Sequence, residues 1–250
     1  MTLNIVQACR SFGGLEAARD VSVNVAPGQV VGLIGPNGAG KTTLINLITG
    51  VLRLDSGSVT VDGQDITTRT IVGVAQSGIS RTFQNVRLLP ESSVLDNVAL
   101  GLGRFEDNTV IDCLLGLPRS YRTRRQTRTK ALEILEDIGM SEYADYPASA
   151  LAYGHQRRVE IARALAAQPK YILLDEPVAG MNDVEAGELA DLVRKIAATG
   201  VGVLLIEHNM GFVNALCSHI YVLSTGKIIG EGGPREIASN PVVVEAYLGA

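Results

Sequence analysis

Cysteine is scarce in this chain of 250 residues, and its three copies, Cys9, Cys113 and Cys217, lie far apart in the sequence. Such spacing produces neither the clustered thiols of a metal site nor the paired half-cystines of a small secreted fold. We therefore expect thiols that stay reduced, as in a protein of the cytosol.

Long hydrophobic runs are also missing. A membrane-spanning helix needs about 20 mostly apolar residues, whereas one of the most apolar runs here, 201–206, has only Val-Gly-Val-Leu-Leu-Ile. Residues 1–12 show no charged start followed by a long apolar core, so no signal peptide is predicted. The pattern predicts a chain that does not cross a membrane, and a role in transport would then require separate membrane subunits.

Positive charge is not in excess, because 22 Lys and Arg stand against 26 Asp and Glu, for a net charge of −4. Binding to nucleic acid by neutralisation of its phosphates is therefore not expected. Hydrophobic residues make up 46% of the chain. That content, at this length, suits one large globular domain, with room for an inserted subdomain. There is no internal repeat and no low-complexity tract.

Strand and helix signals alternate toward both ends of the chain. Residues 30–34 form a continuous apolar run, typical of a strand buried on both faces. Residues 21–25 alternate Val with polar residues, as in a half-buried antiparallel strand. Further strands are expected at 3–8, 57–62, 171–174, 201–206 and 219–223, and helices at 41–49 and 184–198. This order predicts an α/β fold with a parallel sheet, helices on its faces and a small antiparallel β subdomain.

The middle of the chain, 90–163, has a mainly helical pattern. One helix face is predicted from five apolar positions: Ala131, Leu132, Ile134, Leu135 and Ile138. We predict a single domain in which the two parts of the α/β core, 1–89 and 164–250, are separated by a helical subdomain at 90–163. A basic run precedes that face and comprises Arg119, Arg122, Arg124, Arg125, Arg128 and Lys130. A solvated helix face is the preferred interpretation, and contact with a membrane subunit or with anionic lipid is the alternative.

Residues 35–42 read Gly35-Pro36-Asn37-Gly38-Ala39-Gly40-Lys41-Thr42 and match the pattern G-x-x-x-x-G-K-[ST]. The glycines let successive N–H groups turn inward toward phosphate oxygens, and the start of the following helix adds positive potential. Lys41 is expected to reach the β- and γ-phosphates, and the Thr42 hydroxyl to bind Mg²⁺. A chance glycine-rich turn is the alternative, but the preceding strand and following helix argue against it.

Asp175 and Glu176 follow the apolar run 171–174, at the carboxyl end of a predicted central strand. A carboxylate in that position can hold Mg²⁺, directly or through water. Asp175 is therefore the candidate metal ligand, and Glu176 is the candidate base that polarises the attacking water. An ordinary acidic loop after a strand is the other interpretation.

Several classes of protein share such a phosphate loop. GTP-binding members add Asn-Lys-x-Asp or Thr-Lys-x-Asp, and none of the five lysines here stands in such a context. Residues 151–165 read Leu-Ala-Tyr-Gly-His-Gln-Arg-Arg-Val-Glu-Ile-Ala-Arg-Ala-Leu. This segment resembles the signature of ATP-binding cassette (ABC) ATPases, usually written Leu-Ser-Gly-Gly-Gln. The resemblance covers essentially the whole chain and implies a P-loop NTPase core of the RecA type.

Other marks of the family fall in the expected order. Gln84 resembles the Q-loop glutamine, 179–182 resembles the D-loop, and His208 resembles the switch histidine that contacts the γ-phosphate. Phe12 stands where an adenine-stacking aromatic is expected. The resemblance implies binding of ATP and Mg²⁺. The nucleotide-binding residues that it implies are Phe12, Gly35, Pro36, Asn37, Gly38, Ala39, Gly40, Lys41, Thr42, Thr43, Gln84, Asp175, Glu176 and His208. Catalysis would use Glu176, His208 and Lys41, and the metal would use Thr42, Gln84 and Asp175.

The signature segment departs from the usual pattern. Ala152 replaces Ser, Tyr153 replaces the first Gly, and His155 replaces Gln, while Gly154 is retained. In the family this helix end faces the γ-phosphate of ATP bound to the opposite subunit, so backbone donors near Gly154 can still serve. We hypothesise that His155 brings a pH dependence to those contacts.

Four segments, 78–87, 151–154, 206–210 and 246–249, are most similar to the first ATPase subunit of bacterial branched-chain amino acid importers. This resemblance implies a second ABC ATPase subunit, with a heterodimer preferred to a homodimer. It also implies two membrane permease subunits, an external substrate-binding protein that acts indirectly, and a peripheral location on the cytoplasmic face of the membrane. Alternatives are a urea or amide importer, a lipopolysaccharide exporter, and a soluble regulatory ABC ATPase.

Overall fold

The protein is described from a computed structural model, which covers residues 1–103 and 118–248. The chain divides into two compact units. The first unit joins Met1–Gln84 to Lys170–Ala250, and the second is the intervening Asn85–Pro169. The helical subdomain predicted at 90–163 falls inside the second unit.

A four-stranded antiparallel sheet begins the first unit, with strand order β2-β1-β4-β5. Its strands are β1 (Leu3–Phe12), β2 (Leu15–Val25), β4 (Ser56–Val61) and β5 (Gln64–Asp65). Leu3 on β1 pairs with Val25 of β2 on one side and with Val61 of β4 on the other. Alternate residues of β2 are buried from Val21 onward, because one face of this sheet packs on the core and the other meets solvent.

A six-stranded sheet forms the rest of the core, in the order β10-β9-β3-β8-β7-β6, with all neighbours parallel except β9 and β10. Its strands are β3 (Val30–Ile34), β6 (Ile79–Arg81), β7 (Tyr171–Asp175), β8 (Gly202–Ile206), β9 (His219–Ser224) and β10 (Lys227–Gly232). Every residue of β3, β7 and β8 is buried, as in a parallel sheet covered on both faces. The loops that follow these three strands therefore meet at one edge of the sheet.

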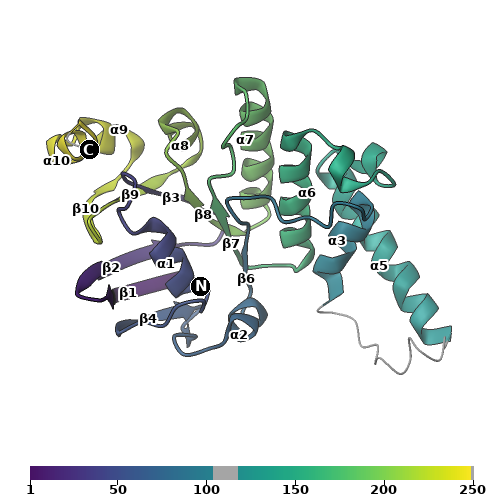
Figure 1. Ribbon diagram of the computed structural model, residues 1–250, viewed down its shortest axis with the longest axis horizontal. Helices are drawn as coiled ribbons and strands as arrows, with labels where there is room; N and C mark the ends of the chain where they lie inside the picture. Colours follow the sequence, from purple (N-terminus) through teal and green to yellow (C-terminus); the bar gives the residue numbers. More distant parts are fainter. Residues whose placement is uncertain (104–117, 249–250) are drawn as a thin grey trace. The chain divides into compact units, whose positions relative to one another are not determined.

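Helices cover this sheet on both sides. They are α1 (Lys41–Ile48), α2 (Ile71–Gln76), α7 (Asp183–Ala198), α8 (Met210–Leu216), α9 (Pro234–Ser239) and α10 (Pro241–Leu248). Figure 1 shows α1 on the side of β3 that faces the antiparallel sheet, with α7 and α8 on the opposite side. One hydrophobic cluster joins the two sheets through α1, with Ile5, Leu33 and Leu44 among its buried members. This core fixes the start of α1 beside the end of β3.

The second unit is helical. Its described elements are α3 (Val94–Leu102), α5 (Pro118–Asp137), α6 (Tyr153–Ala166) and two short 3₁₀ turns, η2 (Ser141–Tyr143) and η3 (Ala148–Ala150). Helix α3 packs against both α5 and α6 (Figure 1). The Ser93 hydroxyl caps α3 by accepting a hydrogen bond from the Asp96 N–H. The buried Asn97 side chain donates to the carbonyl of Leu89 and accepts from the Leu89 N–H, which fastens the entry to the unit.

The predicted helix face on α5 is mostly correct. Ala131 and Leu135 on α5 and Ile138 just after its end are buried, and Ile134 is half-buried, but Leu132 is 42% exposed, so its assignment to that face was wrong. Successive residues on a helix lie about 100° apart, so Leu132 falls beyond the edge of the stripe set by the other positions.

The basic run on α5 is largely exposed where its side chains are described, at Arg124, Arg125 and Lys130. Arg128 makes an ion pair at 3.0 Å with Asp96 of α3. Among the described helices, none is both long enough and apolar enough to cross a bilayer. Cys9 and Cys217 are free thiols, whereas Cys113 lies outside the described residues.

Candidate functional site

The phosphate loop connects β3 to α1. Gly40 is the residue that caps α1 at its start, with φ of +105° and no side-chain hydrogen bond to the first turn. A Cβ atom at Gly40 would lie 2.4 Å from the carbonyl oxygen of Ala17, so the backbone there excludes any side chain. The Ala39 carbonyl accepts a hydrogen bond from the Gly226 N–H of the β9–β10 turn. The loop is thus held by neighbouring backbone, and the first turn of α1 keeps donors for an anion.

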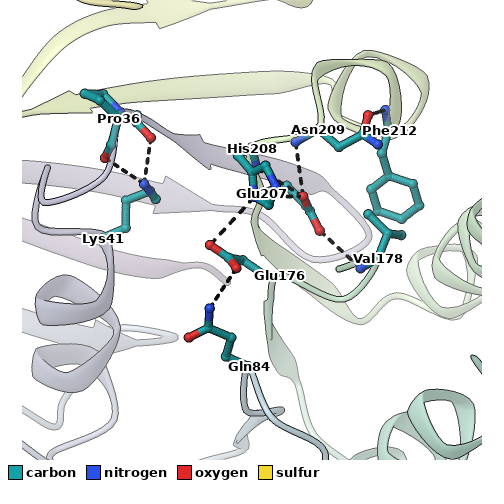
Figure 2. Close-up of polar contacts among 10 residues, drawn as sticks. Pro36, Lys41, Gln84, Glu176, Val178, Glu207, His208, Asn209 and Phe212 are labelled. Atoms are coloured by element: carbon teal, nitrogen blue, oxygen red, sulfur yellow. Dashed lines mark hydrogen bonds and ion pairs between the residues drawn. The ribbon is translucent and has the colours of Figure 1, made fainter. Parts of the chain in front are cut away.

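Lys41 lies at the first position of α1 and points back into the loop. Its Nζ donates to the carbonyl oxygens of Gly35 at 2.6 Å and Pro36 at 2.9 Å, as Figure 2 shows. Burial lowers the pKa of the Lys41 ammonium below its usual value, while the nearby carboxylates of Glu176 and Asp175 oppose that shift. Lys41 is only 9% exposed, and its hydrogen bonds to the loop carbonyls place the ammonium group inside the phosphate loop.

Glu176 is the centre of the polar contacts at the edge of the sheet. It follows β7 directly, and its N–H donates to the carbonyl of Ile206 at the end of β8. Its Oε2 accepts a hydrogen bond of 2.9 Å from Gln84 Nε2, and its Oε1 lies 3.7 Å from Nδ1 of His208. Figure 2 shows the Glu176 carboxylate between the other two side chains. The three residues that the family pattern singles out are therefore brought together by β6, β7 and β8.

The backbone at Glu176 has φ of +47°, a region that is uncommon for residues other than glycine. This turn takes the backbone at Glu176 out of the path of β7, which ends at Asp175.

Asp175 is engaged by an arginine that the sequence analysis did not assign. Its Oδ2 lies 2.9 Å from Nη2 of Arg81, and the two side chains are only 9% and 12% exposed. Nη1 of Arg81 donates to Oδ1 of Asn46 on α1 at 2.6 Å. Arg81 thus connects β6, β7 and α1 beneath the phosphate loop, and it sets the orientation of the Asp175 carboxylate.

A cavity of about 790 Å³ lies over these residues. Predicted residues that line it are Phe12, Asn37, Gly38, Ala39, Gly40, Lys41, Thr42, Thr43, Gln84, Asp175 and Glu176. Gly35 and Pro36 contribute carbonyls behind it, and His208 reaches its edge through Glu176. The volume and lining suit a nucleotide that is held by its phosphates.

The aromatic end of the cavity is formed by Phe12, which is 41% exposed. The guanidinium of Arg10 lies over the Phe12 ring, 4.9 Å from its centroid, and makes an ion pair of 2.7 Å with Asp55. This support holds the ring in place as a surface on which an adenine can stack.

The donors at this edge fit a magnesium ion. Thr42, Gln84 and Asp175 offer hydroxyl, amide and carboxylate oxygens that border one cavity. Among the described residues no group of three or more His, Cys, Asp or Glu side chains forms a metal cage. Mg²⁺ typically keeps several waters and takes one or two protein ligands together with substrate phosphates, so a sparse set of oxygens suits it.

The signature segment belongs to the second unit. Helix α6 begins at Tyr153, and Ala152 caps it with no side-chain hydrogen bond. Arg157 is fully buried, pairs with Glu160 at 2.7 Å and donates to the Tyr153 hydroxyl at 3.2 Å. The His155 ring packs on Tyr143, with ring centroids 4.8 Å apart.

These contacts give physical reasons for two of the departures from the usual signature. Tyr153 is the acceptor of a buried arginine, and His155 packs on an aromatic neighbour. No contact among the residues that the structure describes explains Ala152. Gly154 is buried at the start of the helix, so the backbone donors there are retained.

Comparison with known families decides which of the possible phosphate-loop classes this is. A family model described as ABC transporter matches residues 18–179, more than half of the chain. The chain belongs to the ABC transporter family. A second model, described as branched-chain amino acid ATP-binding cassette transporter, matches residues 227–250. The prediction that this ABC cassette is an ATP hydrolase is confirmed.

Two relatives and one solved structure are similar to this cassette over nearly its whole length. The high-affinity branched-chain amino acid transport ATP-binding protein BraF of Pseudomonas aeruginosa is 40% identical over 239 residues, covering 95% of this chain and 94% of BraF. The lipopolysaccharide export system ATP-binding protein LptB of Haemophilus influenzae is 35% identical, covering 96% and 94%. A solved ABC transporter cassette in its ADP conformation is 36% identical, with full coverage of both chains and a TM-score of 0.87. The predicted P-loop NTPase fold is confirmed.

Sequence reasoning missed some residues of this ABC cassette. Arg81 holds Asp175 and is itself held by Asn46, yet neither Arg81 nor Asn46 belongs to a motif that predicts such a contact. Thr225 and Gly226 line the cavity from the β9–β10 turn, where positive φ at both residues is the signature of a tight hairpin. The pair Thr-Gly directly after the predicted strand at 219–223 was an available signal for that turn, although nothing in it points to a nucleotide.

Proposed function

We propose that this cassette is the ATP-hydrolysing subunit of an importer for branched-chain amino acids. The proposal is supported by the similarity to BraF, a branched-chain amino acid transport ATP-binding protein, and by the family match at the C-terminal end of the chain. The amino acid passes through separate membrane permease subunits, and this subunit lies on the cytoplasmic face of the membrane. A substrate-binding protein outside the membrane delivers the amino acid and acts on the cassette only indirectly.

The observation that carries the proposed chemistry is the Glu176 carboxylate, held between Gln84 and His208 beside the phosphate loop. In this mechanism Glu176 orients the attacking water and takes its proton. His208 contacts the γ-phosphate and keeps the attacking geometry. Lys41 transfers its hydrogen bonds from loop carbonyls to the β- and γ-phosphates, whose charge it offsets.

Thr42, Asp175 and Gln84 would hold Mg²⁺ in the same site. The ion, when bound, neutralises charge on the β- and γ-phosphates. Arg81 keeps the Asp175 carboxylate fixed, so the protein contributes an oriented ligand and not a complete cage.

Each ATP in the proposed working state is shared between two cassettes. The α6 start, from Ala152 through Tyr153 and Gly154 to His155, faces the γ-phosphate of ATP bound to the opposite subunit, and the opposite subunit does the same in return. A second, different ABC ATPase subunit is the proposed partner. ATP then joins the two subunits, and hydrolysis releases them so that the permeases return to their starting state.

Glu176→Gln tests the assigned base. ATP affinity is expected to stay within about twofold of wild type, because the phosphate loop is intact, while turnover falls by about 10²–10⁴. A closed, ATP-bound dimer should accumulate and be visible by size-exclusion chromatography with light scattering. Glu188→Gln, an exposed substitution on α7, serves as the matched control. Wild-type turnover in Glu176→Gln would show that another group is the base.

Transport measurements test the substrate class separately. Cells that carry Glu176→Gln in place of wild type should lose uptake of radiolabelled leucine, isoleucine and valine, with sugar uptake unchanged. Affinity purification of the wild-type cassette from native membranes should recover two permease-like proteins and a second ATPase. Loss of urea or amide uptake alone, or recovery with a lipopolysaccharide export assembly, would reassign the substrate and leave the ATPase chemistry standing.

A further inference from the structure

Glu207 is a buried carboxylate that none of the motifs assigns. It follows β8 directly and precedes His208, and its side chain is fully buried. The residues described around the nucleotide cavity include its neighbour Ile206 but not Glu207. Burial of an ionised carboxylate is energetically costly unless hydrogen bonds satisfy its oxygens. Because Glu207 is fully buried and does not line the cavity, its oxygens are expected to accept hydrogen bonds from the protein.

Three backbone N–H groups, from two different loops, donate hydrogen bonds to the Glu207 carboxylate. Oε1 accepts from the Val178 N–H at 3.1 Å, while Oε2 accepts from the N–H groups of His208 at 3.0 Å and Asn209 at 3.2 Å. Figure 2 shows the carboxylate between the two segments. Val178 lies two residues after Glu176, so Glu207 links the loop of the proposed base to the loop of the proposed γ-phosphate contact.

The backbone on the far side of His208 is fixed as well. The Asn209 side chain caps α8 by accepting from the Phe212 N–H at 3.1 Å. His208 itself is 63% exposed, and its Nδ1 lies 3.7 Å from Glu176 Oε1 and 3.8 Å from Glu207 Oε2. An exposed imidazole on a short turn owes its position to its backbone. Glu207 joins this backbone to Val178, in addition to the hydrogen bond from the Glu176 N–H to the Ile206 carbonyl.

We propose that Glu207 is a positioning residue for ATP hydrolysis, which ties the His208 turn to the loop after Glu176 so that the two side chains keep their relative placement. This inference rests on the proposed roles of Glu176 and His208. Glu207 touches neither nucleotide nor water in this scheme. It acts through the backbone of His208 and Val178.

The chemistry of the three donors explains why a carboxylate stands here. A carboxylate only accepts hydrogen bonds and has two oxygens, one for each loop. The amide of glutamine has the same shape but one oxygen, so its NH₂ group would face an N–H donor of one loop. Glu207→Gln therefore breaks the link on one side with little change in volume, whereas Glu207→Asp keeps two acceptors on a shorter arm.

The test is a double-mutant cycle on the full chain with its partner subunit. Glu207→Gln is expected to lower kcat about tenfold and to leave the ATP dissociation constant within about twofold. In a His208→Ala background the same substitution should change kcat by less than about twofold, because the residue that it positions is gone. Glu231→Gln, an exposed change on β10, should leave kcat and ATP affinity unaltered.

Each alternative outcome is decisive. An unchanged kcat in Glu207→Gln, an equal fall of kcat in both backgrounds, or a loss of ATP affinity as large as the loss of kcat would overturn the inference. If His208→Ala alone keeps wild-type kcat, the proposed role of His208 fails and Glu207 has nothing to position. Where Glu207→Gln does not fold, Glu207→Asp is carried through the same cycle, and the same criteria apply to it.

Discussion

The phosphate loop and the signature segment both present the start of a helix, yet they are held by different means. At the phosphate loop the neighbours of Gly40 and Ala39 are backbone groups, the carbonyl of Ala17 and the N–H of Gly226. At the signature segment the start of α6 is held by side chains, with Arg157 buried between Glu160 and the Tyr153 hydroxyl.

This difference explains why one segment follows its consensus and the other does not. Backbone that packs on backbone leaves no room for a Cβ atom, so glycine is required and its spacing is visible in the sequence. The start of α6 is held by side chains, among them the Tyr153 hydroxyl, so it does not require glycine at positions 152, 153 and 155. Ala152, Tyr153 and His155 are therefore compatible with a folded signature segment.

The largest effect is expected from a methyl group in the phosphate loop. Gly40→Ala would place a Cβ atom 2.4 Å from the Ala17 carbonyl oxygen, whereas a Cβ atom at Gly38 would meet nothing within 4 Å, although both residues have positive φ. Isothermal titration with ATP should show more than about a hundredfold loss of affinity for Gly40→Ala. Gly38→Ala, which adds only backbone strain of about 1–2 kcal/mol, should lose about tenfold. Equal losses would mean that strain, and not backbone packing, holds the loop.

An intermediate effect is expected in the signature segment. Arg157→Met removes the buried cation that lies 2.7 Å from the Glu160 carboxylate and should lower the free energy of unfolding by about 3–5 kcal/mol. Adding Glu160→Leu should recover at least half of that loss, because the buried carboxylate is then removed together with the arginine. Urea unfolding followed by circular dichroism measures both. If the double variant is no more stable than Arg157→Met, the contact with Tyr153 or another partner of Arg157 carries the stability.

The smallest effect is expected at His155. His155→Gln removes the ring contact with Tyr143 and should cost less than about 1 kcal/mol in stability. Because glutamine does not titrate, the ATPase rate of the variant should change less with pH than that of wild type if His155 modulates the phosphate contacts. Superimposable pH profiles of the two proteins would remove His155 from any such role.

Much of the fold was predictable where the pattern is long and continuous. The runs at β3, β7 and β8 are buried throughout, and each was expected as a strand from its apolar residues. Strands β6 and β10 were missed. The first has only Ile79, Ser80 and Arg81, and the second contains two glycines, so neither carries a strand signal of its own. Both strands form because a neighbouring strand, β7 or β9, offers them hydrogen bonds.

The site divides in the same way. The sequence by itself determined the phosphate loop, the Asp175-Glu176 pair and the position of His208 along the chain, because glycine spacing, strand ends and charge are local properties. Only the tertiary structure brought Gln84 and His208 to the Glu176 carboxylate, and set Arg81 on Asp175 and Glu207 between two loops. Those contacts join residues in or just after β6, β7 and β8, strands that are far apart in sequence and become neighbours only when the parallel sheet forms.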